Sequence, residues 1–429
     1  GVAHTAVTPL PASAPPPTCA PSDYLRVIVR GTSDHEIHCV TDEAEPRDIC
    51  VYTDESQEHI LTFVSAGHQL NLIKPFCTGR IFKAELIIFE PDFLINISQI
   101  AQCFEPYGTD ARIAVLKRLT PPANTEAINL GNFASQLLDD ALHGDTSGHD
   151  YADSVTTFFR NNALNLSCCD INRGFHAEGR SQQANIERAL KKHIPQSVKN
   201  FDPGNLMVEP AFFCEMLGLQ GRMDMLQLDF RFLLEQKAGK GEWPQGNFSV
   251  PRQRTSHYVQ LLLYMAIIRY NFARQYADNQ QRLSAFLLYS RYSQPLAAPG
   301  YSPELLAQAI AVRNEIVWRQ KQLAEGDDTF LRTLSPQHLK QAPVNPRLWE
   351  NYSLPALDAI LAPLHSADTL AVEYFFRMLS FVAREHYIAK TGNKSKQASG
   401  LAALWNSSLE EKLDAGNIYA GMSMQAPAT

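Results

Sequence analysis

One unbroken apolar segment restricts the fold of this chain more than any other feature. The run from His257 to Ile268 is strongly apolar and contains no helix breaker, so it predicts a buried helix. Two stretches before it, 218–226 and 230–237, have the pattern of β-strands, and a third, 283–289, follows it. Strands on both sides of one buried helix predict a mixed α/β fold.

The two predicted strands before this helix carry acidic residues. A hairpin that turns near Asp229 would place Asp224 beside Glu235. Side chains alternate along a strand, so Glu235 and Lys237 share a face, while Gln236 points away and could offer its backbone carbonyl. Hydrolysis of a phosphodiester requires a divalent cation that neutralises charge and generates hydroxide, and Mg²⁺ prefers a few carboxylate oxygens. The pattern therefore predicts a metal-dependent nuclease.

Two polar residues interrupt the apolar helix. Gln260 and Tyr264 are four residues apart, which puts both on one helix face. From there they could contact a DNA phosphate, or brace the strand that carries Glu235 and Lys237. Each short pattern alone is more typical of a solvated surface or of an ordinary core. Their order within one short region favours a catalytic site.

Taken together, the patterns resemble a known enzyme family. Gly-x-x-Asp at 221–224, Glu-x-Lys at 235–237 and Gln-x-x-x-Tyr at 260–264 are similar to the signatures of the RecB-like branch of the PD-(D/E)XK nuclease superfamily. Within that branch, the stretches 208–224 and 234–241 resemble the nuclease half of the Dna-two type replication helicase/nucleases. Less specific matches extend the resemblance over most of the chain from about residue 80.

The resemblance implies an α/β fold with a restriction-endonuclease-like mixed sheet flanked by helices, and a Mg²⁺ or Mn²⁺ cofactor. It makes Asp224 and Glu235 metal ligands and Lys237 the group that positions or polarises water. Gln260 and Tyr264 become the supporting motif of the catalytic site. The implied activity is in-line hydrolysis of phosphodiester bonds in single-stranded DNA ends or flaps, in DNA replication or repair.

Other positions match the family pattern less well. Glu209 corresponds to an upstream acidic residue that helps to hold metal in some relatives, and Glu215 is the alternative. Relatives often carry a metal-binding histidine four residues after a glycine, but counting from Gly131 this chain has Ser135. His143, two turns further along the same predicted helix, could substitute. Because serine is a poor metal ligand, a second metal ion is expected to bind weakly or only with substrate.

The cysteines bear on a further cofactor. Many relatives hold an iron-sulfur cluster with one upstream and three downstream cysteines, whereas all eight cysteines of this chain lie at or before Cys214. None forms a Cys-x-x-Cys pair, so we expect no iron-sulfur cluster. Scattered cysteines in a chain without a recognisable leader peptide instead predict buried thiols in a reducing cytoplasm.

The charge of the chain limits how it binds nucleic acid. A net charge of -7 and a pI near 6.0 argue against coating DNA by bulk electrostatics, so binding should be local. Arg252 and Arg254, just before the predicted helix, and Lys240 are the best candidate DNA contacts. The remaining basic candidates are more typical of solvated helix faces, namely Arg188, Lys191, Lys192, Lys199, Arg269 and Arg274.

Four regions are expected along the chain. Residues 1–22 are rich in proline and alanine and predict a disordered tail. Residues 23–90, with β-rich runs at 24–29, 59–64 and 84–89, predict a small β domain, either a barrel or a sheet. Residues 91–294 would form the nuclease core, and 295–429 a helical region that packs on the core or links to a missing helicase. The core helices are expected at 128–143, 150–165, 181–193 and 255–277.

Several absences narrow the function. No run of about 18 apolar residues predicts a membrane span. No Gly-x-x-x-x-Gly-Lys-Ser/Thr loop occurs, so a helicase motor would have to be supplied from outside these residues, in cis or in trans. The alternative function is a catalytically impaired nucleic-acid-binding or helicase-docking module, which the serine at position 135 and the acidic net charge favour.

Overall fold

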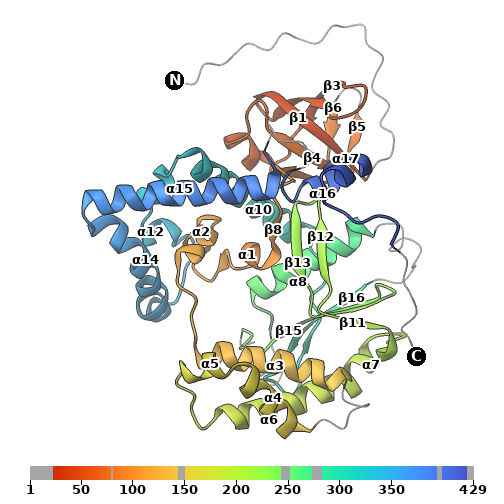
Figure 1. Cartoon of the computed structure of the whole chain (residues 1–429), viewed down its shortest axis with the longest axis vertical. Helices are drawn as coiled ribbons and strands as arrows, with labels where there is room; N and C mark the ends of the chain where they lie inside the picture. The colour runs from red at the N-terminus through yellow and green to blue at the C-terminus, as the bar shows by residue number, and fades with distance from the viewer. Residues whose placement is uncertain are drawn as a thin grey trace.

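The chain, seen here in a computed structural model, is a mixed α/β protein with several sheets (Figure 1). The structure describes residues 23–78, 81–143, 150–242, 252–272, 283–393 and 399–422. The expected tail at 1–22 and the end of the expected helix at 255–277 lie outside these ranges. The mixed α/β class predicted from the sequence is confirmed.

The N-terminal part forms one seven-stranded sheet in the order β5-β6-β3-β2-β1-β4-β7. Along β1, buried Leu25, Val27 and Val29 alternate with more exposed neighbours, as expected for a sheet with one face in the core. The strands are β1 (Tyr24–Ser33), β2 (Glu36–Thr41), β3 (Asp48–Tyr52), β4 (Gln69–Ile73), β5 (Phe76–Thr78), β6 (Ile81–Lys83) and β7 (Leu86–Phe89).

The β-rich run predicted at 59–64 is wrong, because this segment forms a 3-10 helix, η1 (Glu58–Thr62). Its buried residues are Ile60, Phe63 and Val64, which stand at helical spacing rather than in strand alternation. The β-branched and aromatic composition suggested a strand, but the spacing of the buried positions favours a helical turn.

A bent hairpin leads to the candidate site. It consists of β11 (Leu206–Val208) and β12 (Ala211–Cys214), paired antiparallel with β14 (Met225–Gln227) and β13 (Leu219–Arg222). The single strand predicted at 218–226 is therefore wrong: β13 belongs to a three-stranded sheet in the order β12-β13-β8, with β8 at Ile95–Asn96, and β14 to a five-stranded sheet.

The opposite side of the hairpin explains the break. Glu209 has a φ of 49° and Pro210 has no N–H to donate, so the partner strand bends there. The chain stays paired across the bend, because Glu209 N donates to Asp224 O over 3.0 Å and Met223 N to Pro210 O over 3.0 Å. Asp224 consequently lies at the bend between the two sheets.

The five-stranded sheet has the order β11-β14-β15-β16-β17. β14 pairs antiparallel with β15 (Phe232–Lys237), and β15 pairs in parallel with β16 (Ser284–Tyr289), which is followed by β17 (Leu296–Ala297). Helix α8 (Thr255–Asn271) lies between β15 and β16 in sequence and packs on β16. The strand, buried helix and strand predicted for this region are present.

Helices cover the other face of this sheet (Figure 1). They are α3 (Glu126–His143), α4 (Tyr151–Asn161), α5 (Ala163–Ser167), α6 (Phe175–Arg188), the π-helical turn η3 (Ala189–His193) and α7 (Ile194–Ser197), followed by the 3-10 turn η4 (Pro203–Asn205). The helix predicted at 150–165 is divided at Asn162, whose side-chain amide donates to the Phe158 carbonyl over 3.0 Å. The helix predicted at 181–193 begins earlier, at Phe175.

Short elements connect the N-terminal sheet to the rest, and helices dominate the C-terminal part. The connecting elements are α1 (Ile97–Ala101), β9 (Phe104–Glu105), β10 (Gly108–Thr109) and α2 (Arg112–Leu119). The C-terminal helices are α10 (Pro303–Glu325), α11 (Thr329–Arg332), α12 (Pro336–Leu339), α13 (Pro346–Leu348), the π-helical turn η5 (Trp349–Ser353), α14 (Leu354–Ser366), α15 (Thr369–Thr391), α16 (Ala403–Asn406) and α17 (Leu409–Asp414).

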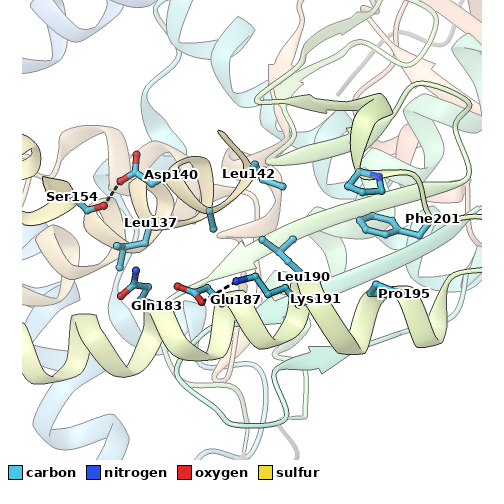
Figure 2. A pocket seen from close by; sticks show the side chains of 12 residues that line it. Leu137, Asp140, Leu142, Ser154, Gln183, Glu187, Leu190, Lys191, Pro195 and Phe201 are labelled. Atoms are coloured by element: carbon cyan, nitrogen blue, oxygen red, sulfur yellow. Dashed lines mark hydrogen bonds and ion pairs between the residues drawn. The ribbon is translucent and has the colours of Figure 1, made fainter. Parts of the chain in front are cut away.

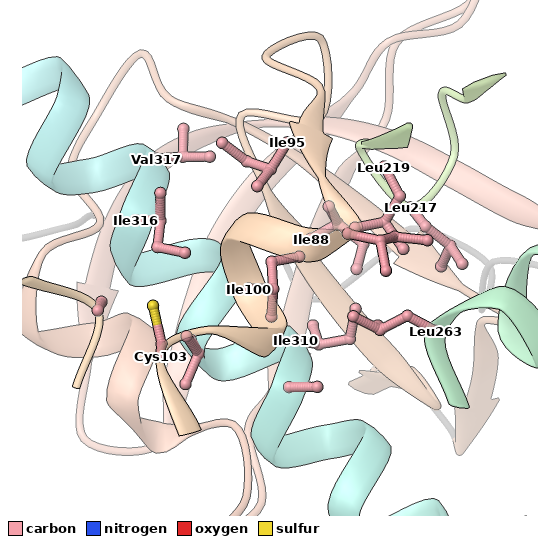
Figure 3. Close-up of a cluster of buried hydrophobic side chains, with 14 of the residues drawn as sticks. Ile88, Ile95, Ile100, Cys103, Leu217, Leu219, Leu263, Ile310, Ile316 and Val317 are labelled. Atoms are coloured by element: carbon pink, nitrogen blue, oxygen red, sulfur yellow. The ribbon is translucent and has the colours of Figure 1, made fainter. Parts of the chain in front are cut away.

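Helix α10 joins these parts into one core (Figure 3). Its residue Ile310 lies in the same buried cluster as Ile88 of β7 and Leu263 of α8. The fully buried Arg313 donates to the carbonyls of Phe89, Glu90, Phe93 and Gly218. Gly218 has a φ of +61° and its Cα faces this guanidinium, so any larger residue would displace Arg313. One arginine thus fixes the turn of the β12–β13 hairpin against the N-terminal sheet.

Candidate active site

Strand β15 presents two charged side chains to the helix α8 side of the sheet. Glu235 is almost fully buried, and Lys237 Nζ donates to Glu235 Oε1 over 2.8 Å. Gln236 points to the opposite face, where its amide donates to the Ala134 carbonyl of α3 over 3.0 Å. The alternation expected from the sequence therefore holds along this strand.

The bent hairpin brings Asp224 to the same strand. Its Oδ2 accepts a hydrogen bond from the backbone N–H of Gln236 over 2.5 Å. Burial raises the pKa of Asp224, and the Lys237 ammonium opposes that shift. The two carboxylates of the predicted site therefore lie side by side, although Asp224 belongs to the break between two strands rather than to a continuous one.

Gln260 joins the two charged groups of β15. Its Nε2 donates to Glu235 Oε1 over 2.7 Å, and its Oε1 accepts from Lys237 Nζ over 2.9 Å. Of the two roles considered for this side chain, bracing the strand is the one that the contacts show. The bonds hold the ammonium and one carboxylate oxygen in a closed triangle.

Tyr264 explains why the first motif begins with glycine. Its hydroxyl donates to the Arg222 carbonyl over 2.6 Å. A Cβ at Gly221 would lie 2.9 Å from Cε1 of the Tyr264 ring, closer than real side chains approach. Gly221 therefore lets α8 come close enough to hold the residues just before Asp224, and the first and third motifs form one packing unit.

The second carboxylate oxygen of Glu235 is the most informative atom of the site. Among the described residues, Oε2 is buried and forms no hydrogen bond of good geometry, although the Asp224 backbone lies close enough to lower the pKa of Glu235 slightly. Burial raises the pKa of Glu235 to about 7, against the attraction of Lys237. An unpartnered buried acceptor is costly, so a native structure that keeps one calls for an explanation, such as an ion bound in the functional state.

The donor set suits a hard divalent cation. Mg²⁺ is commonly held by one or two carboxylates, with waters and substrate phosphates as further ligands. Asp224 and Glu235 supply two carboxylates. No group of three histidine, cysteine or acidic side chains suited to a metal ion occurs within the described ranges. The residues therefore fit a cation that substrate helps to hold, rather than a closed protein cage.

The additional acidic candidates lie away from this pair or are engaged elsewhere. Glu209 lies near enough that its charge raises the pKa of Asp224, but its carboxylate is partly exposed and pairs with Arg222 over 3.1 Å. Glu215 lies at the turn end of the β12–β13 hairpin, whereas Asp224 follows the open end. Glu209 is thus the better placed of the two.

A cavity of about 260 Å³ opens beside Lys237. Gly131 and Ser135 of α3 form one wall, and Ser135 Oγ donates to the Gly131 carbonyl over 3.3 Å. Ser135, the position at which the resemblance implies a histidine, therefore faces the cavity beside Lys237. His143 ends α3 two turns later, and its side chain lies outside what the structure describes.

The same cavity exposes basic side chains. Lys240 and Arg254 line it and are exposed, as a DNA contact requires. Arg252 is also exposed, and its backbone forms an isolated bridge with Glu242 next to the cavity. Among the other basic candidates, Arg188, Lys191 and Arg269 bind neighbouring groups within the chain, Lys192 and Lys199 are exposed on other elements, and Arg274 lies outside the described residues.

The sequence reasoning missed His257, which also lines the cavity. Its Nδ1 hydrogen-bonds the Tyr289 hydroxyl over 2.9 Å. Burial and the nearby Lys237 and Arg254 charges lower the pKa of His257 to about 3, so it stays neutral. The sequence could have indicated this residue, because His257 precedes Gln260 by three positions and so occupies the same face of α8.

A second cavity, of about 530 Å³, lies among α3, α4, α6 and η3 (Figure 2). Its acidic groups already have partners, since Asp140 accepts from Ser154 over 2.6 Å and Glu187 from Lys191 over 3.4 Å. It adjoins the apolar cluster that contains Leu234, on the face of the sheet opposite to Glu235. It is therefore separate from the candidate site.

Two further expectations concern the whole chain. Among the described cysteines, Cys39, Cys103 and Cys214 are buried thiols, while Cys168 is exposed, so the expectation of buried thiols holds for some of them. Burial raises the pKa of Cys39 and of Cys103 to about 12. None of the helices in the described ranges has the length and apolar character needed to cross a bilayer.

Comparison with known proteins gives no assignment: no protein-family model matches the chain, and no curated protein is significantly similar to it. What can be said of its function rests on the site itself.

Proposed function

We propose that this chain is a Mg²⁺- or Mn²⁺-dependent deoxyribonuclease that hydrolyses phosphodiester bonds in single-stranded DNA ends or flaps. The observation that carries the proposal is the buried, unpartnered Glu235 Oε2 beside Asp224 and Lys237. Lys237 lines a cavity that also has exposed basic residues, and the two carboxylates lie beside Lys237, an arrangement that suits a divalent cation and a phosphodiester.

The fold supports the same proposal. Helix α3, the antiparallel pair β14 and β15, helix α8 and the parallel strand β16 follow one another around one mixed sheet. We infer a restriction-endonuclease-like core from this order together with the motifs. The chain would act in the cytoplasm during DNA replication or repair, with a helicase motor supplied in cis or in trans.

The residues of the site have distinct tasks in this proposal. Asp224 and Glu235 would hold the cation, which when bound neutralises charge on the phosphodiester and lowers the pKa of water. Lys237, held by Gln260, would orient the attacking water, and its ammonium would stabilise the negative charge that develops on phosphate oxygens. Arg254 and Lys240 would hold the neighbouring phosphate, and Tyr264 keeps the Asp224 segment in place.

A cleavage assay tests the proposal. End-labelled single-stranded, flapped and duplex DNA would be incubated with Mg²⁺, Mn²⁺ or EDTA and with the wild-type chain, Lys237→Ala or the control Lys192→Ala, which changes an exposed lysine on η3. We expect metal-dependent cutting that Lys237→Ala lowers by about 1,000-fold or more, because groups of a catalytic unit act together. Lys192→Ala should cut like wild type, because Lys192 lies away from the candidate site. Equal cutting by wild type and Lys237→Ala would place the activity elsewhere.

One observation favours a second candidate, a nucleic-acid-binding or helicase-docking module without turnover. The cavity wall carries Ser135 in place of a metal-binding side chain, and the described residues provide only two well-placed carboxylates. In that case DNA would bind in EDTA and in Mg²⁺ with similar affinity, and no metal would produce cleavage.

A further inference from the structure

Helix α15 is apolar on two opposite sides. On one side, Phe376 and Ala383 are buried, and the helix packs along α10 (Figure 1). On the other side, Tyr374, Phe381 and Ile388 follow one another at intervals of seven residues and are 66%, 53% and 36% exposed. A surface helix of a soluble protein normally has one apolar side, which faces the core. The second side therefore suggests a partner.

The exposed side forms a continuous stripe rather than isolated residues. Steps of three, four or seven residues keep its members on one face of the helix. Isolated exposed apolar residues are ordinary, but a contiguous row marks an interaction surface. The residues that define this α15 seam are Leu370, Tyr374, Met378, Phe381 and Ile388.

Two charged residues make the seam self-complementary. Arg377 precedes Phe381 by four positions and Glu385 follows it by four. Both are exposed, and within the part of the chain that the structure describes neither forms an ion pair. If two copies of α15 pack antiparallel with Phe381 at the centre, Arg377 of each copy faces Glu385 of the other. Tyr374 and Ile388, each seven positions from Phe381, then also face one another.

We propose that the α15 seam is the interface of a symmetric homodimer, in which α15 packs antiparallel on α15 of a second copy. A two-fold axis at Phe381 makes the interface isologous, so each favourable contact occurs twice. The seam is about 27 Å long at 1.5 Å per residue, and burying it on both copies covers on the order of 1,000 Å². That area is at the lower end for specific interfaces, so dissociation in the micromolar range is expected. The proposal does not depend on the proposed nuclease activity.

The central residue provides the first test. Sedimentation equilibrium of the full chain from about 0.5 to 200 μM should show a monomer–dimer equilibrium. Phe381→Asp should raise the dissociation constant at least about 100-fold, because two charges would be buried at the centre of the interface. The control Leu164→Asp changes an apolar residue that is 79% exposed on α5 and should leave the constant unchanged.

The charge pair tests the register. Arg377→Glu alone and Glu385→Arg alone should each weaken the dimer about 10-fold, because each places like charges opposite one another twice. The double variant Arg377→Glu/Glu385→Arg restores opposite charges and should return the dissociation constant to within about 3-fold of wild type. Circular dichroism of every variant should be unchanged, since both side chains are exposed.

Three outcomes would overturn the proposal. A chain that stays monomeric over the whole concentration range has no such dimer, and the seam then serves another protein partner. A dimer that Phe381→Asp leaves intact uses a different surface. A double charge variant as weak as the single ones excludes the antiparallel pairing centred on Phe381.

Discussion

The two faces of strand β15 are equally buried but differ in chemistry. On the α3 side, Phe232 and Leu234 pack in an apolar cluster, and the amide of Gln236 donates to the Ala134 carbonyl. On the α8 side, Glu235 is as well buried, yet one of its carboxylate oxygens has no partner among the described residues. On the α3 side the Gln236 amide oxygen also lacks a partner among the described residues, but it belongs to a neutral group, whereas the Glu235 oxygen belongs to a carboxyl that can carry a negative charge. An unpartnered carboxylate oxygen beside an ammonium and a second carboxylate is therefore the feature that separates the candidate site from the core.

The largest expected effect is on DNA cleavage, where variants on the two faces of β15 should differ most. Glu235→Gln keeps the shape of the side chain but removes a cation ligand, and we expect DNA cleavage to fall by about 1,000-fold or more. Gln236→Ala, one position away on the other face, should lose less than about 10-fold. Initial cleavage rates at saturating Mg²⁺ measure both. Similar losses for the two variants would mean that the faces do not differ in function.

The second prediction concerns the free energy of unfolding, for which a change on the α3 side should be harmful and a change at Glu235 should not. Leu234→Ala leaves a cavity in the α3-side cluster and should lower the free energy of unfolding by about 3 to 4 kcal/mol. Glu235→Gln should raise it in metal-free protein at pH 8, because the wild-type carboxylate is charged there although burial disfavours its charge. Urea unfolding in EDTA distinguishes these signs, and a large loss in Glu235→Gln would contradict the account.

The stability of the folded state should also depend on pH through Glu235. Burial raises the pKa of Glu235 from 4.5 to about 7, so the folded state holds a proton that the unfolded state has already released. This contribution to stability is fully present below pH 4.5 and is lost as the pH rises to about 7. The full loss is about 3 kcal/mol. Buried Asp224 contributes with the same sign.

Metal-free unfolding followed between these two pH values tests that prediction. Glu235→Gln should have a flatter profile than wild type, and Mg²⁺ should raise the stability of wild type above pH 7 but not that of the variant. Parallel profiles for the two proteins would show that Glu235 does not titrate in this range.

A smaller effect is expected from the glycine beneath Tyr264. Gly221→Ala forces the Tyr264 ring to move, and we expect a loss of about 1 to 3 kcal/mol in stability and a reduced cleavage rate. Gly239→Ala, on the cavity, meets no atom within 4 Å and is the matched control. Thermal unfolding of both variants makes the comparison. Equal stability would mean that the contact between the motifs is not needed.

Much of the candidate site could be predicted because its signals are local. The face shared by Glu235 and Lys237 follows from strand alternation, and that shared by Gln260 and Tyr264 follows from helical spacing. The bend that carries Asp224 could not be predicted from its own segment, because its cause, Glu209 and Pro210, lies in the partner strand.

Longer-range features were hidden for the same reason. Arg313 on α10 holds the Gly218 turn from 95 positions away in the sequence. No local pattern around Gly218 predicts this contact. The error at 59–64 has another cause, since β-branched composition was given more weight than the helical spacing of Ile60, Phe63 and Val64. Composition is a weaker guide than the period of the buried positions.

The central claim is that Glu235 Oε2 faces a divalent cation. Its most direct test is Mn²⁺ binding, measured by electron paramagnetic resonance of free Mn²⁺ with wild type, Glu235→Gln and Gln236→Ala, in the presence of a short non-cleavable single-stranded oligonucleotide. We predict that wild type and Gln236→Ala take up Mn²⁺ with similar affinity and that Glu235→Gln binds at least about 10-fold more weakly. Equal Mn²⁺ binding by wild type and Glu235→Gln, or none by wild type, would contradict the account.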